Sequence, residues 1–283
     1  MKPMLAFKVQ QHGHQLSNPF YAQPKLNGVR ALCNGSCFQS RDEHLWNSKV
    51  LAHLHKQVQP IFQRFPNFIT DGELYKHGLS LQKINQAVAV NRHEPTPITP
   101  TIEYHIFDIL DCENAAKDFS YRAEQLDAIQ SIITSFGLTH IKVVPTHLCG
   151  SMDFTEPLYK QYLKAGYEGL MYRSLSHMYG LAQNCGNKEN RWKCLLKRKE
   201  WLDKEFRIVD FTLTKGKKDE RGFQVTCEIE GSGETFNVGS GLSDDELEYY
   251  IDNSPIGQWA KVKFETYSDG GVPLKPTILA ILS

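Results

Sequence analysis

The chain changes character at about Asp203, and this change constrains its fold more than any other feature. Before that residue, short β-like runs alternate with amphipathic helical patterns. After it the pattern is almost entirely β, with glycine-rich turns and one short acidic helix at residues 243–253. These two patterns of secondary structure predict an α+β protein of two domains, which we place at residues 1–202 and 203–283.

Periodicity locates the elements of the first domain. Apolar residues recur at helical spacing at 51–65 and 126–136, and two more helices are expected at 82–90 and 157–165. Strands are expected at 21–33, 37–41, 68–75, 102–110, 141–145, 169–173 and 192–199. The first two should form a hairpin, because Asn34-Gly35 between them is a strong two-residue turn signal.

The second domain is predicted to be a small barrel. Five strands are expected at residues 206–214, 223–230, 235–239, 259–267 and 277–282, within about eighty residues. Such a run of strands with a single helix is typical of the OB fold, which often holds nucleic acid.

Composition excludes several classes of protein. A chain of 283 residues with 41% apolar residues supplies real cores, and it has neither a membrane-spanning apolar stretch nor an export signal within residues 1–14. We therefore expect a cytoplasmic protein, in the host cell if the source is a virus. The seven cysteines form no Cys-x-x-Cys pair, which argues against a disulfide framework and a zinc site.

The most informative segment reads Gln23-Pro-Lys-Leu-Asn-Gly-Val-Arg30. A lysine attacks phosphorus well only when its ammonium is destabilised by burial or by nearby cations. Arg30 supplies one such cation, and Gly28 permits a tight bend around a phosphate. Taken alone, a lysine in such a segment is more often part of an exposed strand edge.

A second basic segment reads Leu195-Leu-Lys-Arg-Lys199 and follows Arg191 and Lys193. On a regular strand Lys193, Lys197 and Lys199 would share one face. Three ammonium groups on one face favour a bound anion such as a triphosphate, and they would depress the pKa of a lysine across the cleft. The alternative is a basic edge strand that discourages aggregation.

Three further segments carry acidic or aromatic candidates. Thr70-Asp-Gly-Glu-Leu74 offers Glu73 to a ribose hydroxyl, Tyr167-Glu-Gly-Leu-Met-Tyr-Arg173 offers Glu168 to a divalent cation, and Tyr104-His-Ile-Phe-Asp108 offers Phe107 as a stacking face for a purine. Each has a plain alternative, since Asp-Gly and Glu-Gly are common in turns and an aromatic in an apolar strand is usually core.

The order of these motifs along the chain resembles that of the covalent nucleotidyltransferase superfamily, which comprises ATP-dependent DNA ligases, RNA ligases and mRNA capping enzymes. The resemblance covers nearly the whole chain and is strongest to minimal DNA ligases of the virus and phage type. It implies a nucleotidyltransferase (adenylation) domain of antiparallel sheets flanked by helices at 1–202, followed by an OB-fold domain at 203–283.

The resemblance also assigns residues and partners. Lys25 would become adenylylated, Arg30 and Arg41 would contact the nick, and Glu168 would sit at the metal. The implied nucleotide site comprises Gln23, Pro24, Lys25, Arg30, Arg41, Glu73, Phe107, Lys197 and Lys199. The implied cofactors are ATP and Mg²⁺ (or Mn²⁺), and the implied partner of a monomeric enzyme is nicked double-stranded DNA, as used in repair, replication and recombination.

The sequence departs from the family pattern in three places. Asn27 stands where the lysine motif usually has aspartate, and the C-terminal motif at 272–278 keeps only Lys275 as a cation. No DNA-binding domain is expected before Lys25 and no clasping insertion in the barrel. Two alternatives stay open: an RNA ligase or capping-type enzyme, which would share the chemistry of Lys25, and a non-catalytic nucleic-acid-binding protein, which Asn27 and the C-terminal motif make conceivable. The resemblance also implies a hinge near residues 201–204.

Overall fold

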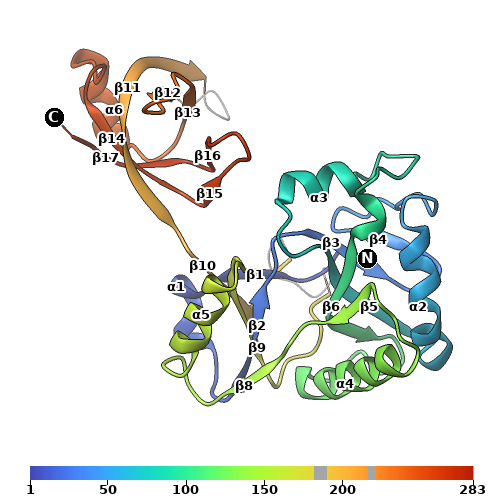
Figure 1. The fold of residues 1–283 in the computed structure, drawn as a ribbon. Coiled ribbons are helices and arrows are strands. Elements are labelled where there is room, and N and C mark those ends of the chain that lie inside the picture. Colours follow the sequence, from blue (N-terminus) through green and yellow to red (C-terminus); the bar gives the residue numbers. More distant parts are fainter. Residues whose placement is uncertain (182–189, 216–220, 283) are drawn as a thin grey trace. The chain divides into compact units, whose positions relative to one another are not determined.

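The computed structural model of the protein describes residues 1–181, 190–215 and 221–282 (Figure 1). The chain divides into two compact units, Met1–Lys199 and Glu200–Ser283. Each unit has its own apolar core, so each is described by itself.

The first five-stranded sheet of unit 1, which we call sheet A, carries the lysine motif. Its strand order is β1 (Leu5–Lys8), β10 (Arg191–Lys199), β9 (Gly169–Ser174), β2 (Phe20–Lys25) and β8 (His147–Cys149). Only the β1–β10 pair is parallel among these strand pairs. Aromatic side chains of α5 (Thr155–Lys164) pack with those of β2 and β9 in one apolar cluster. Short helical turns follow β1 at α1 (Val9–His12) and η1 (Gly13–Gln15).

The second sheet of unit 1, sheet B, has the order β4 (Phe38–Ser40), β3 (Val29–Cys33), β5 (Phe68–Tyr75), β6 (Glu103–Asp111) and β7 (Ile141–Val143). The helices α2 (Ala52–Arg64), α3 (Leu81–Val88) and α4 (Phe119–Ser135) bury their apolar faces in the same core, and η2 (Thr99–Thr101) precedes β6. In α2, Leu54, Val58 and Ile61 repeat at the predicted helical spacing and are fully buried.

Unit 2 is built around one long strand. β11 (Leu202–Lys215) pairs with β14 (Trp259–Phe264) through its first half and with β12 (Arg221–Glu228) through its second. The outer strands are β13 (Thr235–Val238) and β17 (Thr277–Leu282), and the Ile278 N–H donates to the Ser240 carbonyl at 2.9 Å. A two-stranded ribbon joins β15 (Thr266–Tyr267) to β16 (Pro273–Leu274).

The acidic helix of unit 2, α6 (Asp244–Asp252), begins with a capping box. Ser243 accepts from the Glu246 N–H, and the Glu246 side chain accepts from the Ser243 N–H, which satisfies two otherwise free donors of the first turn. Leu247 is the buried contact of this helix.

One strand prediction is wrong in an informative way. The expected strand at 21–33 breaks at Leu26–Gly28, so that β2 lies in sheet A and β3 in sheet B. Gly28 passes so close to β5 that a Cβ atom there would lie 2.4 Å from the Leu74 carbonyl oxygen. Lys25 therefore lies where the chain crosses from one sheet to the other.

Other expectations are confirmed. Strands 68–75 and 277–282 have the predicted bounds, and β3 and β4 form the hairpin at Asn34-Gly35, where Gly35 has φ 86°. β1 and β8 were not predicted. In the described part of the chain, no helix has the length and apolar character needed to cross a membrane.

Candidate active site

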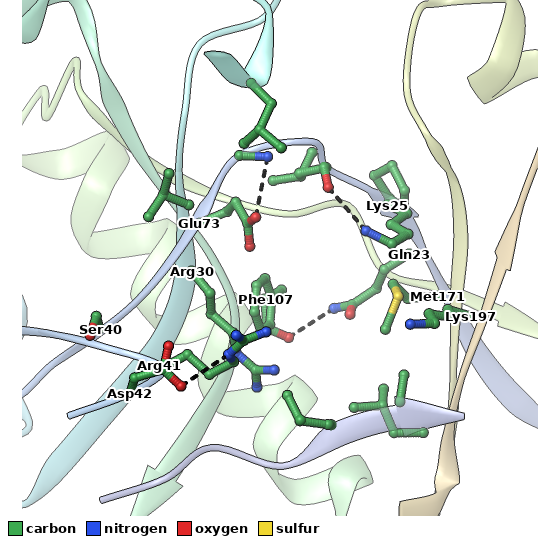
Figure 2. Close-up of a pocket in the computed structure, with 18 of the residues that line it drawn as sticks. Gln23, Lys25, Arg30, Ser40, Arg41, Asp42, Glu73, Phe107, Met171 and Lys197 are labelled. Atoms are coloured by element: carbon green, nitrogen blue, oxygen red, sulfur yellow. Dashed lines mark hydrogen bonds and ion pairs between the residues drawn. The ribbon is translucent and has the colours of Figure 1, made fainter. Parts of the chain in front are cut away.

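A pocket of about 640 Å³ in unit 1 is lined by residues from both sheets (Figure 2). Its lining includes eight residues that the motifs selected: Gln23, Pro24, Lys25, Arg30, Arg41, Glu73, Phe107 and Lys197. Two others join the site through ion pairs: Glu168 pairs with Lys25, and Lys199 pairs with Glu168. The structure thus brings together all the candidates of one site from segments far apart in the sequence.

Lys25 ends β2, and its ammonium group is held by Glu168. One carboxylate oxygen of Glu168 pairs with the Lys25 Nζ and the other with the Lys199 Nζ. The backbone is fixed as well, because the Glu168 N–H donates to the Lys25 carbonyl at 3.0 Å. Less than a fifth of each of these three side chains is exposed. A single carboxylate therefore bridges two amines at the pocket.

Strand register explains this bridge. Lys25 on β2 and Lys199 on β10 both pair with Gly169 on β9, the strand between them. Gly169 has φ 146°, and a Cβ atom there would lie 2.1 Å from the Arg198 carbonyl oxygen. Gly169 thus permits the close approach of β9 to β10, and the preceding residue, Glu168, contacts both lysines.

Lys197 lines the pocket two residues before Lys199. Burial lowers the pKa of Lys197 to about 8, and the positive charges of Lys199, Arg191 and Lys25 lower it in the same direction. This cation is therefore poised to change its charge at mildly alkaline pH.

The expectation that Lys193 shares this face is wrong. Lys193 is exposed and is not part of the pocket lining. Between Ala6 and Phe7 of β1 the register jumps from Trp192 to Leu196 of β10, so an irregularity interrupts the alternation of side chains. Leu195 and Lys197, beyond the irregularity, do line the pocket.

Glu73 of β5 lies on the other side of the pocket from the basic strand and accepts a hydrogen bond from the Gly28 N–H at 3.2 Å (Figure 2). Burial raises the pKa of Glu73 to about 7, despite the opposing charges of Lys25 and Arg30. Near neutral pH this carboxyl can therefore both donate and accept hydrogen bonds, as a sugar hydroxyl requires.

Phe107 lies at the centre of the pocket between two arginine contacts. The guanidinium carbons of Arg30 and Arg173 are each 5.3 Å from its ring centroid, within the range of a cation–π contact. Arg173 in turn pairs with the fully buried carboxylate of Asp108, which also binds Arg122. These guanidinium groups frame the aromatic side chain.

Gln23 ties the two sheets together beneath Phe107. Its Nε2 donates to the Phe107 carbonyl and to the Thr146 hydroxyl, both at 2.9 Å, and its Oε1 accepts from the Arg173 Nε at 2.7 Å. Gln23 is 1% exposed. The predicted nucleotide ligand Gln23 thus reaches the pocket with its amide already occupied by protein partners.

Arg41 lies at the rim. Its side chain is 58% exposed and pairs loosely with Asp42, at 3.5 Å, which leaves the guanidinium accessible to a large partner. The motifs did not single out Arg191 or the α3 residues Leu81 and Asn85, which also line the pocket. Arg191 could have been found from its place in the basic segment, whereas nothing in the sequence of α3 indicated that it faces a pocket.

A divalent metal has few protein ligands here. In the described ranges, no three side chains among His, Cys, Asp and Glu are grouped so that they could hold a metal ion. Mg²⁺ commonly binds one or two carboxylates together with water and substrate phosphates. Glu168, beside Lys25, is compatible with that arrangement.

A lysine at the crossing of two sheets, beside a basic strand and followed by a small β unit, is the arrangement that the motif order predicts for a covalent nucleotidyltransferase. A family model described as "ATP dependent DNA ligase domain" matches residues 3–195. The chain belongs to this family.

Known proteins agree with this assignment. The DNA ligase of African swine fever virus (isolate Tick/South Africa/Pretoriuskop Pr4/1996) is 28% identical over 215 residues, which cover 73% of this chain and 48% of the viral protein. The chain thus spans about half the length of the curated relatives it matches.

Two solved structures share the fold. A Lig E DNA ligase is 22% identical, with 99% of both chains covered and a TM-score of 0.73. The Chlorella virus DNA ligase-adenylate is also 22% identical, with 99% of both chains covered and a TM-score of 0.53. The predicted fold class, a nucleotidyltransferase domain followed by an OB-fold domain, is confirmed.

Proposed function

We propose that the protein is an ATP-dependent DNA ligase that seals nicks in duplex DNA through a lysyl-AMP intermediate on Lys25. The observation that carries the proposal is the meeting of Lys25, Glu168 and Lys199 at a pocket lined by further cations. Residues 1–202 would carry out the nucleotide chemistry and residues 203–283 would hold DNA. The enzyme would work as a monomer, because a nick is an asymmetric target. It would act in the cytoplasm.

The reaction would consist of three displacements at phosphorus. The Lys25 amine attacks the α-phosphate of ATP and pyrophosphate leaves. The AMP then passes to the 5′-phosphate at a nick, and the adjacent 3′-hydroxyl displaces AMP as the new phosphodiester forms. Each step needs positioning and charge neutralisation more than any special catalytic group.

The side chains at the pocket suit these steps. Glu168 holds the Lys25 Nζ at the end of β2, and the charges of Lys197 and Lys199 would neutralise the leaving phosphates. Glu73 would bind the ribose and Phe107 would stack on adenine. Arg30 and Arg41 would contact phosphates of ATP or the nick.

Magnesium or manganese fits the site through Glu168. The ion would supply positive charge to the phosphates when bound. Glu168, which lies beside Lys25, would hold the ion.

Incubation with α-labelled ATP and Mg²⁺ tests the proposal. We expect the wild-type protein to carry a covalent label that Lys25→Ala abolishes, and mass spectrometry should find AMP on Lys25. Lys49→Ala is a matched control, because Lys49 is an exposed lysine paired with Glu94 and should leave labelling unchanged. Absence of label from the folded wild-type protein would favour the non-catalytic alternative.

The acceptor and the nucleotide need a separate test. Nicked DNA, nicked RNA and mixed nicks should be offered side by side, each with ATP or GTP. We expect sealing of nicked DNA with ATP. Preference for an RNA nick or for GTP would favour the RNA ligase or capping-type alternative.

The hinge at 201–204 is part of the same proposal. Limited proteolysis should cleave this segment at different rates with and without ATP or nicked DNA. Equal rates in all conditions would remove the hinge from the mechanism.

A further inference from the structure

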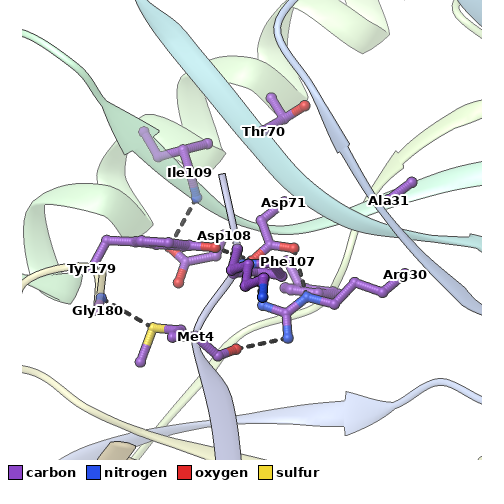
Figure 3. Close-up of polar contacts among 12 residues, drawn as sticks. Met4, Arg30, Ala31, Thr70, Asp71, Phe107, Asp108, Ile109, Tyr179 and Gly180 are labelled. Carbon is purple, nitrogen blue, oxygen red and sulfur yellow. Dashed lines mark hydrogen bonds and ion pairs between the residues drawn. The ribbon is translucent and has the colours of Figure 1, made fainter. Parts of the chain in front are cut away.

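A buried tyrosine lies near Arg30, which lines the pocket (Figure 3). Tyr179 belongs to the segment that follows β9 and is 2% exposed. Its hydroxyl donates to the Asp71 Oδ2 at 2.6 Å. A buried hydroxyl bonded to a buried carboxylate is a strong, charge-assisted contact, and the chemistry proposed above does not use it.

Asp71 is the anchor of Arg30. The Arg30 Nε donates to the Asp71 Oδ1 at 2.9 Å and the Nη2 donates to the Asp71 Oδ2 at 2.5 Å, a two-pronged pair in which Asp71 is 1% exposed. The Arg30 Nη1 donates to the Met4 carbonyl at 2.7 Å. These bonds use three of the five guanidinium N–H groups, which leaves two for an anion in the pocket.

The plane of the Asp71 carboxylate decides where Arg30 points. A carboxylate turns easily about its terminal torsion, which has broad minima, while a two-pronged pair keeps the guanidinium in the carboxylate plane. The Asp71 Oδ2 accepts from Tyr179 as well as from Arg30. The tyrosine hydroxyl therefore restricts rotation of the carboxylate and so fixes its plane.

The segment that carries Tyr179 is itself held by the contacts of the next residue. The next residue, Gly180, packs so closely on Trp192 that a Cβ atom would lie 2.3 Å from its ring. The Gly180 N–H also donates to the Met4 sulfur at 3.5 Å. Met4 thus contacts the segment of Tyr179 through its sulfur and Arg30 through its carbonyl oxygen. It links the two groups that hold Arg30 in place.

We propose that Tyr179 is a positioning residue for Arg30, acting through Asp71 so that the two remaining guanidinium N–H groups face the phosphate of the nick. The inference rests on the proposed function, which gives Arg30 a phosphate contact. Tyr179 touches neither the nucleotide nor the reacting atoms in this scheme.

Tyr179→Phe removes the hydroxyl and keeps the ring. We expect purified lysyl-AMP protein carrying this change to seal nicked DNA about tenfold more slowly in a single turnover, a loss in the range of one charge-assisted hydrogen bond. Tyr121→Phe is a matched control, since the Tyr121 hydroxyl also donates to a carboxylate, Asp111, at 2.8 Å, and neither residue lines the pocket. It should lose similar stability and seal at the wild-type rate.

If Tyr179 had only a structural role, the two variants would seal nicks at equally reduced rates, or their rates would follow their melting temperatures. Either result would overturn the inference. Sealing by Tyr179→Phe at the wild-type rate would overturn it as well. Arg30→Ala distinguishes the phosphate contact of Arg30 from the positioning role of Tyr179. If Arg30→Ala seals normally, the phosphate contact proposed for Arg30 is wrong; if it fails while Tyr179→Phe seals normally, only the positioning role is wrong.

Discussion

The two sides of the pocket hold their charges in different ways. On sheet A, Lys25 and Lys199 share the single carboxylate of Glu168, and all three side chains remain partly exposed. On sheet B, the carboxylates of Asp71 and Asp108 are almost completely buried. Asp71 accepts from two nitrogen atoms of Arg30, and Asp108 accepts from two of Arg122 and one of Arg173.

This difference separates parts that can move from parts that cannot. An ammonium group on a flexible four-carbon stem exchanges partners readily, whereas a guanidinium paired in its fork geometry has little freedom left. The lysine side is therefore suited to successive partners, such as ATP, pyrophosphate and AMP. The arginine side is suited to a fixed frame around Phe107.

The largest expected effect tests the frame. Asp108→Asn should lower the free energy of unfolding of unit 1 by about 3–5 kcal/mol, because Arg122 and Arg173 lose their buried counter-charge. Glu168→Gln should cost less, about 1.5–3 kcal/mol, the range for a hydrogen bond to a charged group, because Glu168 and its lysine partners are not completely buried. Urea unfolding followed by tryptophan fluorescence measures both, and equal losses would erase the distinction between the two sides.

The second test concerns the movable side. Lys199→Ala should slow formation of lysyl-AMP by roughly 10- to 100-fold, the range expected for one hydrogen bond to a charged group. Lys193→Ala is the control, because Lys193 is an exposed lysine of the same strand, whereas the Lys199 ammonium pairs with Glu168 at the site. Equal rates for the two variants, measured with labelled ATP, would contradict the proposed phosphate contact.

A smaller effect is expected for the pH dependence of pyrophosphate binding. The pKa of Lys197 is lowered to about 8, so its positive charge is present below that pH and is lost as the pH rises through it. Pyrophosphate should therefore bind severalfold more weakly at pH 9 than at pH 7. Lys197→Arg keeps its charge throughout and should flatten the profile measured by calorimetry; an unchanged profile in this variant would exclude Lys197 as its source.

The last test concerns the pH dependence of stability at Glu73. Its pKa is raised from 4.5 to about 7 in the folded protein, so its stabilising contribution is present below about 4.5 and is lost as the pH rises to about 7. Glu73→Gln should therefore gain stability relative to wild type between pH 4.5 and pH 7. Glu94→Gln, at an exposed position, should show no such trend in the same unfolding series, and matching trends would contradict the burial of Glu73 as the cause.

Local patterns sufficed for much of the fold and for the residues of the site. The alternation at 68–75 and the turn residues Asn34-Gly35 act over a few neighbours, so they predict β5 and the β3–β4 hairpin directly. The order of the motifs selected the side chains that the structure gathers around Lys25.

Such local patterns could not predict contacts between residues far apart in the sequence. The break at Leu26–Gly28 depends on the approach of Gly28 to Leu74, and the irregularity in β10 depends on its pairing with β1. Asp71 was read only as part of a common Asp-Gly turn, yet it is the buried partner of Arg30 and Tyr179. Partners more than forty residues away leave no periodic trace in a single sequence.

Gln23 has a practical consequence for redesign. Its amide joins the strand that ends in Lys25 to the main chain of Phe107, the aromatic platform proposed for adenine. A substitution that shifts this platform to admit a larger base would also pull on the strand carrying the nucleophile. Engineering of altered nucleotide preference should therefore begin at Leu81 and Asn85 of α3, which line the same pocket from an independent element.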